Sequence, residues 1–244
     1  MNSRIDLSSI SKHENIALQF SGGKDSLACV HLLRPHWDRI TLYHVDTGDL
    51  LPEVREIVDG VEAMVPHFVR IETNSADWMK RFGLPSDLVP TTCTVAGMWM
   101  GFGGRRIVDR FDCCAENIMG PIHRRMLADG VTLAIRGTKR ADMPTLAAES
   151  GDTTMGYEIC LPIRDWSHAD VFAYLREVGA PICRVYEHKV NAPECATCPA
   201  WWNEGRAGYL KKYHPDLNAA YQAKLALVAA EIAPVHRTLM EELA

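Results

Sequence analysis

A glycine-rich turn between an apolar run and a helical pattern constrains this chain most. Residues 15–19 predict a strand, residues 27–33 predict a helix, and Phe-Ser-Gly-Gly-Lys-Asp-Ser joins them. Adjacent glycines let backbone N–H groups approach an anion, while the helix N-terminus and Lys24 add positive charge. We therefore predict a phosphate cradle, with an ordinary helix-capping turn as the alternative. The candidate nucleotide-binding residues are Ser21, Gly22, Gly23, Lys24, Asp25 and Ser26.

Strand and helix patterns alternate after this turn. Residues 39–45 and 67–72 predict further strands around a helix at 52–64, and residues 131–135 predict a fourth strand. This order indicates an α/β fold, with a doubly wound, mostly parallel sheet and helices on both faces. We expect one domain over residues 1–200. Residues 201–244 are expected to form a helical C-terminal extension packed on the same domain.

Two predicted strand tips carry further candidate ligands. Asp46, Thr47 and Gly48 follow the second strand, where an acidic residue suits a ribose hydroxyl or a Mg²⁺ ion bound to phosphate. A simple turn or helix cap is the alternative for Asp46. Residues 136–142 follow the fourth strand and predict a second anion site, although solvated surface charge also explains them. The candidate catalytic residues are Lys24, Asp25, Arg136 and Arg140, and Lys139 joins the binding set.

The composition limits the classes of protein to which this chain can belong. The chain has 244 residues, of which 47% are hydrophobic and 23% charged, as in a soluble globular protein. No apolar stretch is long enough for a membrane span, and Met1–Asp6 lack the apolar core of a signal peptide. We expect a cytoplasmic protein that makes no membrane contact. The net charge of −5 argues against non-specific nucleic-acid binding by the whole surface.

Eight cysteines in a reducing compartment favour metal-binding, catalytic or buried thiols over disulfides. Cys113 and Cys114 are adjacent, and Cys195 and Cys198 form a C-x-x-C. Four thiolates suit an iron–sulfur cluster or tetrahedral zinc, and unliganded thiols remain an alternative. The other cysteines, Cys29, Cys93, Cys160 and Cys183, are predicted to be inert core residues.

Several of these segments resemble one superfamily. Ser-Gly-Gly-Lys-Asp-Ser resembles the PP-loop of the ATP pyrophosphatases, or adenine nucleotide α-hydrolases. Residues 46–53 and the Asp165-Trp166-Ser167 segment are similar to stretches of the sulfonucleotide reductases, which include phosphoadenosine and adenosine phosphosulfate reductases. The cysteine pattern resembles that of the iron–sulfur adenosine phosphosulfate reductases. Over residues 15–200 the resemblance implies an adenine nucleotide ligand and a [4Fe–4S] cluster on Cys113, Cys114, Cys195 and Cys198.

Two departures from the reductase pattern bear on function. Asn117 and Ile118 stand where those reductases carry an Arg-Lys pair. No cysteine follows Cys198, whereas the reductases act through a nucleophilic cysteine in a C-terminal Glu-Cys-Gly-x-His-like segment. A thiosulfonate intermediate therefore has no obvious carrier in this sequence.

Three functions fit these residues. The first is Mg²⁺-dependent adenylation by ATP, coupled to sulfur transfer onto an acceptor, which the intact Lys24-Asp25-Ser26 favours. The second is reduction of adenosine phosphosulfate (APS) or its 3′-phosphorylated form (PAPS), with a thioredoxin-like donor in trans. The third is a non-catalytic nucleotide or redox sensor. A sulfur donor and a homo-oligomer are also expected. A nucleic-acid acceptor would use a basic rim of Arg105, Arg106, Arg110, Arg124 and Arg125.

Residues 75–111 are the hardest to assign. Their Gly-, Met- and Trp-rich part, residues 96–104, suits either a mobile flap over a substrate or an irregular segment that covers the core.

Overall fold

The computed structural model describes residues 7–104, 106–143, 145–188 and 191–244. They fall into two compact units. Unit 1 holds residues up to 46, 52–71 and 121–192, and unit 2 holds residues 47–51, 72–120 and 193–244. The C-terminal helices thus share a compact unit with a segment from the middle of the chain. The expected domain boundary at residue 200 stays a prediction.

Unit 1 is built on a parallel sheet in the order β3-β2-β1-β6-β7. Ile16 pairs with Ile40 on one side of β1 and with Leu133 on the other. The chain order reverses between β1 and β6, so the carboxyl ends of these two strands define the switch point where α/β sheets bind ligands. The strands are β1 (Ile16–Gln19), β2 (Ile40–Asp46), β3 (Phe68–Glu72), β6 (Leu133–Ile135) and β7 (Glu158–Cys160).

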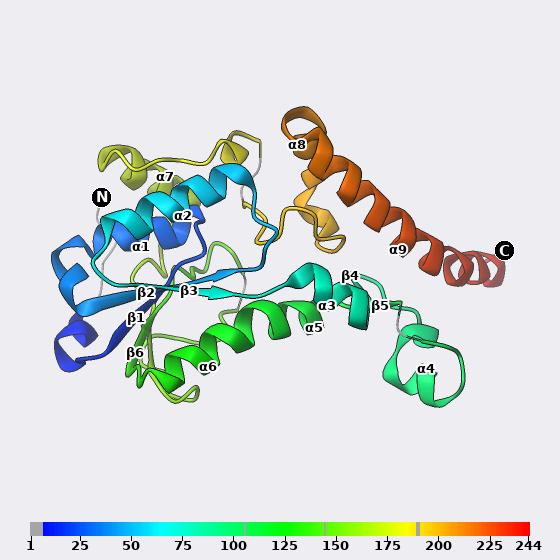
Figure 1. Cartoon of the computed structure of the whole chain (residues 1–244), viewed down its shortest axis with the longest axis horizontal. Helices are drawn as coiled ribbons and strands as arrows, with labels where there is room; N and C mark the ends of the chain where they lie inside the picture. Colours follow the sequence, from blue (N-terminus) through cyan, green and yellow to red (C-terminus); the bar gives the residue numbers. More distant parts are fainter. Residues whose placement is uncertain (1–6, 105, 144, 189–190) are drawn as a thin grey trace. The chain divides into compact units, whose positions relative to one another are not determined.

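Helices cover both faces of this sheet, which confirms the doubly wound α/β prediction. α1 (Lys24–Leu32), α2 (Pro52–Met64) and α7 (His168–Glu177) lie on one face, and α6 (Gly120–Ala128) lies on the other (Figure 1). α1 and α7 pack against each other. The loop after β1 therefore opens at the switch point between strands that are covered on both sides.

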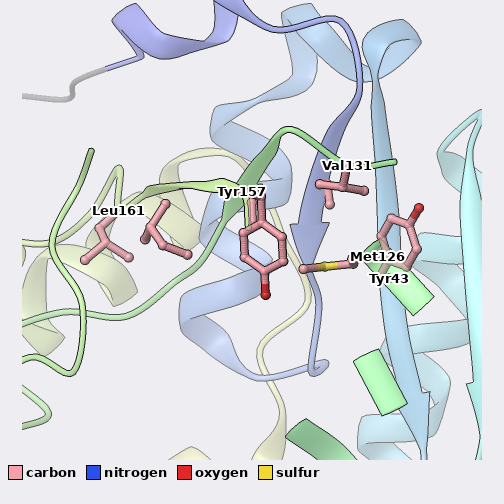
Figure 2. Packing of buried hydrophobic residues seen from close by; sticks show 8 residues of the cluster. Tyr43, Met126, Val131, Tyr157 and Leu161 are labelled. Carbon is pink, nitrogen blue, oxygen red and sulfur yellow. The ribbon is translucent and has the colours of Figure 1, made fainter. Parts of the chain in front are cut away.

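The face under α6 carries one apolar cluster (Figure 2). Met126 of α6 is fully buried against Tyr43 of β2, Val131 and Tyr157. Tyr43 keeps its hydroxyl satisfied by donating to the Asp129 carboxylate at 2.9 Å. Burying such large side chains contributes roughly 1.5–3 kcal/mol each, which fixes α6 against the strands that carry the site.

Unit 2 contains a two-stranded parallel sheet and most of the remaining helices. A small core joins Cys93, Ile107 and Val228. Residues 75–111 are more regular than the sequence predicts, and part of them covers this core, while Trp99 and Met100 are exposed. The elements are α3 (Ser75–Phe82), β4 (Leu84–Ser86), α4 (Val95–Trp99), β5 (Ile107–Asp109), α5 (Arg110–Cys114), α8 (Arg206–Tyr213) and α9 (Pro215–Glu242).

α5 continues without a break through a π-helical turn, Ala115–Met119, into α6. α6 is therefore a continuation of this turn, because its first residue, Gly120, already has helical backbone angles. Within the described ranges, no helix combines the length and the apolarity that a membrane crossing requires.

Candidate nucleotide site and cysteine group

The loop after β1 holds its shape by internal hydrogen bonds. The Ser21 and Ser26 hydroxyls lie 3.2 Å apart, and Ser26 donates to the Gly23 carbonyl at 3.1 Å. Gly22 has a φ of +83°, and a Cβ there would lie 2.8 Å from Val58 and 2.9 Å from Val54 of α2. Only glycine fits both the backbone angle and this close contact.

Gly137, just after β6, packs against the same loop. A Cβ at Gly137 would lie 2.8 Å from backbone atoms of Asp25 and Ser26. The tips of β1 and β6 therefore form one surface, as the sheet order requires. Gly137 lies in the strand tip predicted to bind an anion, but no role in the site was predicted for it.

Lys24 does not project into solvent. Its side chain is 1% exposed, and its ammonium donates to Asp25 at 2.9 Å and to Asn191 at 3.3 Å. Burial lowers the pKa of Lys24, and the Asp25 carboxylate opposes that shift. The Lys24 backbone N–H donates to the Tyr186 hydroxyl at 2.8 Å, which caps the start of α1.

Asp25 lies between two lysines. Lys139, fully buried, places its ammonium 3.1 Å from Asp25 and 2.5 Å from Asp142. His168 lies at the edge of this group, with its Nε2 3.9 Å from Asp142. Burial and the two lysines lower the pKa of His168. The site thus contains a buried network of alternating charge whose Asp25 carboxylate is already neutralised.

Asp46 is neutralised in the same way at the tip of β2. Arg55 donates to it at 2.8 Å and Arg70 at 3.4 Å. Thr47 and Gly48, predicted beside Asp46, fall in unit 2. Asp25 and Asp46 therefore both carry cationic partners within unit 1.

The two predicted arginines of the β6 tip differ. Arg136 donates to the Tyr157 hydroxyl at 3.4 Å, and its Nε is buried with no hydrogen-bond partner in the part of the chain that is described. Arg140 is 56% exposed and pairs with Glu149 at 3.2 Å and Asp165 at 3.8 Å. Of the two, only Arg136 keeps a buried donor without a partner.

Tyr186, Asn191, Asp142 and His168 belong to this site but were not among the predicted site residues. Asp142 had a signal, since it lies three residues after Lys139 within the predicted anion site at 136–142. Asn191 and His168 had none, since their contacts depend on how α7 and the segment after it fold back onto α1.

The four-cysteine group consists of Cys113, Cys114, Cys195 and Cys198, and all lie in unit 2. Burial, then the nearby Cys198, raises the pKa of Cys113 to about 12 and of Cys114 to about 11. Burial also raises the pKa of Cys195, with Cys198 adding to the rise. Among the described residues, however, no three Cys, His, Asp or Glu side chains are placed to hold a metal ion, and this includes the four cysteines.

Residues around the Cys195–Cys198 turn hold it tightly. Asp49 accepts from the Thr197 N–H at 3.0 Å and from its hydroxyl at 2.8 Å. Arg206 of α8 donates to the Cys195 carbonyl at 2.6 Å, and Lys224 of α9 donates to the Thr197 hydroxyl at 2.6 Å. Thr47 Oγ1 lies 3.3 Å from Cys195 Sγ. Contacts from Asp49, α8 and α9 therefore hold the Cys195–Cys198 half of the four-cysteine group in place.

The remaining cysteines, Cys29, Cys93, Cys160 and Cys183, are all buried, as predicted. Burial raises the pKa of Cys29 strongly and that of Cys183 to about 11. A buried thiol with a raised pKa is a poor nucleophile.

Most of the arginines predicted to form a basic rim are in ion pairs with carboxylates. Arg106 bonds Glu231, Arg110 bonds Asp87, and Arg125 bonds Asp129, at 2.9, 3.1 and 2.8 Å. Arg105 lies outside the described residues.

The sheet, its order and the Ser-Gly-Gly-Lys-Asp-Ser loop define an α/β nucleotide-binding protein of the PP-loop superfamily. Residues 15–201 match the family described as phosphoadenosine phosphosulfate reductase domain, and the chain belongs to that family. The match covers every segment that carried the resemblance in sequence.

Curated relatives and a solved structure agree with this family. An adenosine 5′-phosphosulfate reductase of Allochromatium vinosum is 24% identical over 195 residues, 76% of this chain and 68% of the relative. That of Burkholderia cepacia is 22% identical over 210 residues, 80% and 78% respectively. The fold is similar to a phosphoadenylyl-sulfate reductase from Candida auris, solved as a phosphate complex, with a TM-score of 0.52 and 16% identity over 73% of this chain and 80% of that one.

Proposed function

We propose that this protein binds a sulfonucleotide, APS or PAPS, at the loop after β1 and supports its reduction to sulfite by a thiol donor in trans. The observation that carries the proposal is the charge arrangement in unit 1. Asp25 is paired with Lys24 and Lys139, and Asp46 with Arg55 and Arg70. The Mg²⁺ ion bound with ATP usually takes one or two protein carboxylates as ligands, and here both candidate carboxylates are already in ion pairs. A sulfonucleotide is reduced without cleavage of a pyrophosphate, so cationic and N–H donors suffice.

The reaction balances without a cysteine after Cys198. A donor thiolate attacks the sulfur of the sulfonucleotide and forms an S–S bond, while the S–O bond breaks and the nucleotide leaves as AMP or its 3′-phosphate. A second donor thiol then attacks the donor sulfur of the thiosulfonate and releases sulfite. The donor dithiol becomes a disulfide, and sulfate sulfur gains two electrons. A thioredoxin-like dithiol supplies both thiols, which agrees with the burial of Cys29, Cys93, Cys160 and Cys183.

Within this proposal Arg136 and the loop hold the anionic end of the nucleotide. The buried Nε of Arg136 is a donor that a sulfate or phosphate oxygen would satisfy. Lys24 acts from within the loop, where its pairing with Asp25 fixes the start of α1. Removing such positioned donors weakens binding of the charge that develops on the leaving phosphate.

The four-cysteine group is proposed to hold an iron–sulfur cluster. Its donor set consists of four thiols, which suits such a cluster, and the sequence spacing of the two pairs supports the proposal. A bound cluster would supply electrostatic or redox chemistry; the cysteines and their partners hold it in place. Iron and sulfide content after anaerobic purification tests this part by itself.

ATP-dependent adenylation with sulfur transfer is the second candidate function. The intact Ser-Gly-Gly-Lys-Asp-Ser favours it, and the family and its reductase relatives favour the first. Assays of one protein preparation with sulfonucleotides and with ATP distinguish the two functions.

The test uses the full chain, purified without oxygen, with thioredoxin and its reductase. We expect sulfite from APS or PAPS and no pyrophosphate from ATP with Mg²⁺. Arg136→Gln should lower sulfite release about 100-fold, as loss of an oxyanion donor does. Arg164→Gln is the matched control, because Arg164 pairs with Glu149 and Asp165, neither of which is a predicted site residue. Pyrophosphate release from ATP without sulfite release would replace the proposal with adenylation.

A further inference from the structure

We propose that Tyr157 and His123 are positioning residues, which orient Arg136 toward the anionic group of the nucleotide through two consecutive hydrogen bonds. This role rests on the proposed function. His123 lies on α6, Tyr157 directly precedes β7, and Arg136 directly follows β6, so three elements of unit 1 meet at this point.

Arg136 differs from the other cations of its strand tip in its partners. Lys139 and Arg140 both form ion pairs with carboxylates, whereas no ion pair within the described ranges includes Arg136. Its Nε is buried and has no hydrogen-bond partner there. A buried cation without a counter-ion is costly, and an anionic ligand removes that cost.

Tyr157 links the guanidinium of Arg136 to His123. The guanidinium donates to the Tyr157 hydroxyl at 3.4 Å, and this hydroxyl lies 2.9 Å from Nδ1 of His123. Arginine can only donate, so the hydroxyl accepts from Arg136 and keeps its own hydrogen for His123. The rings of His123 and Tyr157 also pack edge to face, with centroids 5.5 Å apart.

The Tyr157 ring gives this arrangement a fixed base. Tyr157 is 3% exposed and belongs to the apolar cluster under α6 (Figure 2). Burial raises the pKa of Tyr157, and the charge of Arg136 opposes that shift. The hydroxyl therefore keeps its proton near neutral pH, as the two consecutive hydrogen bonds require.

The partners that hold Arg136 carry no negative charge. Besides the Tyr157 hydroxyl, the guanidinium contacts Met155 Sδ at 3.4 Å. A carboxylate in either place would orient the guanidinium but would also neutralise it. Neutral partners orient it and leave its full charge for the ligand, which is how a preorganised oxyanion donor acts.

The test uses variants of the full chain and two measurements. Tyr157→Phe removes the hydroxyl, His123→Leu removes its acceptor, and His123→Asn restores a polar atom near the place of Nδ1. The double variant with Arg136→Gln asks whether Tyr157 acts through Arg136. Tyr43→Phe is the matched control, because Tyr43 is a buried tyrosine of the same cluster whose hydroxyl bonds Asp129 instead.

The measurements are kcat/KM for sulfite release with thioredoxin, and the affinity for inorganic sulfate by calorimetry. Circular dichroism establishes that each variant is folded. Tyr157→Phe and His123→Leu should each lower both quantities about 5-fold, as loss of one hydrogen bond does. His123→Asn should recover most of the loss, and Tyr43→Phe should match the wild type.

In the Arg136→Gln background, Tyr157→Phe should have no further effect. An equal loss with and without Arg136, or a Tyr157→Phe variant that behaves like Tyr43→Phe, would show that Tyr157 does not position Arg136. Sulfate binding with these couplings but no sulfite release would overturn the proposed reaction and support the positioning role. A wild-type chain that neither binds sulfate nor releases sulfite would overturn both.

Discussion

The shape of the loop after β1 depends on Gly137, which lies far from the loop in sequence. A side chain there would meet the backbone of Asp25 and Ser26 rather than a flexible side chain, so the strand tip or the loop would have to move. The shape of the loop is therefore set by its own glycines and by the packing of β6 against it.

Gly137→Ala is expected to destabilise unit 1 by about 1–3 kcal/mol, because the added methyl group overpacks a backbone contact. It should also weaken sulfonucleotide binding, measured by calorimetry. Gly60→Ala is the matched control, since Gly60 lies inside α2 with no atom near its Cβ position, and there alanine should add about 0.5–1 kcal/mol. Equal binding by both variants would show that Gly137 does not shape the loop.

His44 provides a pH dependence of stability at the same scale. Its side chain is buried between Phe20 and Phe68, with Nδ1 2.9 Å from the Phe20 carbonyl oxygen. Burial lowers the pKa of His44, and Arg70 lowers it further. As pH falls through about 6.5, the unfolded chain therefore takes up this proton before the folded one, and stability is lost.

We expect the unfolding free energy of the wild type to fall when the pH is lowered from above to below about 6.5. For His44→Gln we expect a smaller fall over the same pH range. Urea titrations at the two pH values measure this difference. The exposed His236 gives the control His236→Gln, which should keep the wild-type slope. A wild-type slope in His44→Gln would contradict the assignment.

At the scale of elements, the start of α7 carries a complete capping box. The Ser167 hydroxyl accepts from the Asp170 N–H at 3.1 Å, and the Asp170 carboxylate accepts from the Ser167 N–H at 2.8 Å. Asp170 stands here in the place that Glu usually takes in a capping box. Because α7 packs on α1 and begins at His168, its cap also positions a residue of the nucleotide site.

Ser167→Ala should cost about 1 kcal/mol of unfolding free energy, measured by urea titration, because it leaves an N–H of the first turn without its partner. Ser167→Thr should recover most of that loss. A Thr variant as unstable as the Ala variant would show that the hydroxyl contributes nothing.

Sequence patterns predicted the helices and strands whose hydrophobic pattern lies within their own residues. The helix at 52–64 has its predicted bounds, and β1, β2 and β3 differ from theirs by about a residue at each end. β6 begins two residues later than predicted, because its pairing with β1 begins at Leu133, opposite Ile16. The regular elements within 75–111 were missed because short strands among glycines and prolines have no periodic signal.

The site residues likewise divide into those with a local sequence signal and those without one. The loop glycines and the cysteine pairs were evident from spacing, whereas Asn191, His168, Arg206 and Lys224 meet their partners only through tertiary contacts. Asn117 illustrates the limit: it stands at a reductase-pattern basic position, and in the structure it donates to the Cys113 carbonyl at 3.0 Å. Its amide supports α5 and brings no positive charge.

For the whole molecule, the two sites lie in different compact units, and each has its own expected response to ligand. We expect a sulfonucleotide to slow amide hydrogen exchange at residues 20–26 and 136–142, because bound ligand suppresses local opening. Removal of iron should speed exchange at 47–51 and 195–198. Hydrogen exchange read by mass spectrometry, with adenosine as the control ligand, checks both. Sulfonucleotide protection confined to unit 2 would contradict the placement of the nucleotide site.

The cap on α1 also bears on how the protein is made. The Tyr186 hydroxyl that satisfies the Lys24 N–H comes from 162 positions further along the chain, and Gly137 also follows the loop at a distance. During synthesis the loop motif leaves the ribosome long before these partners do. A nascent chain therefore carries the motif without Tyr186 and Gly137, and the loop reaches its final shape late in translation.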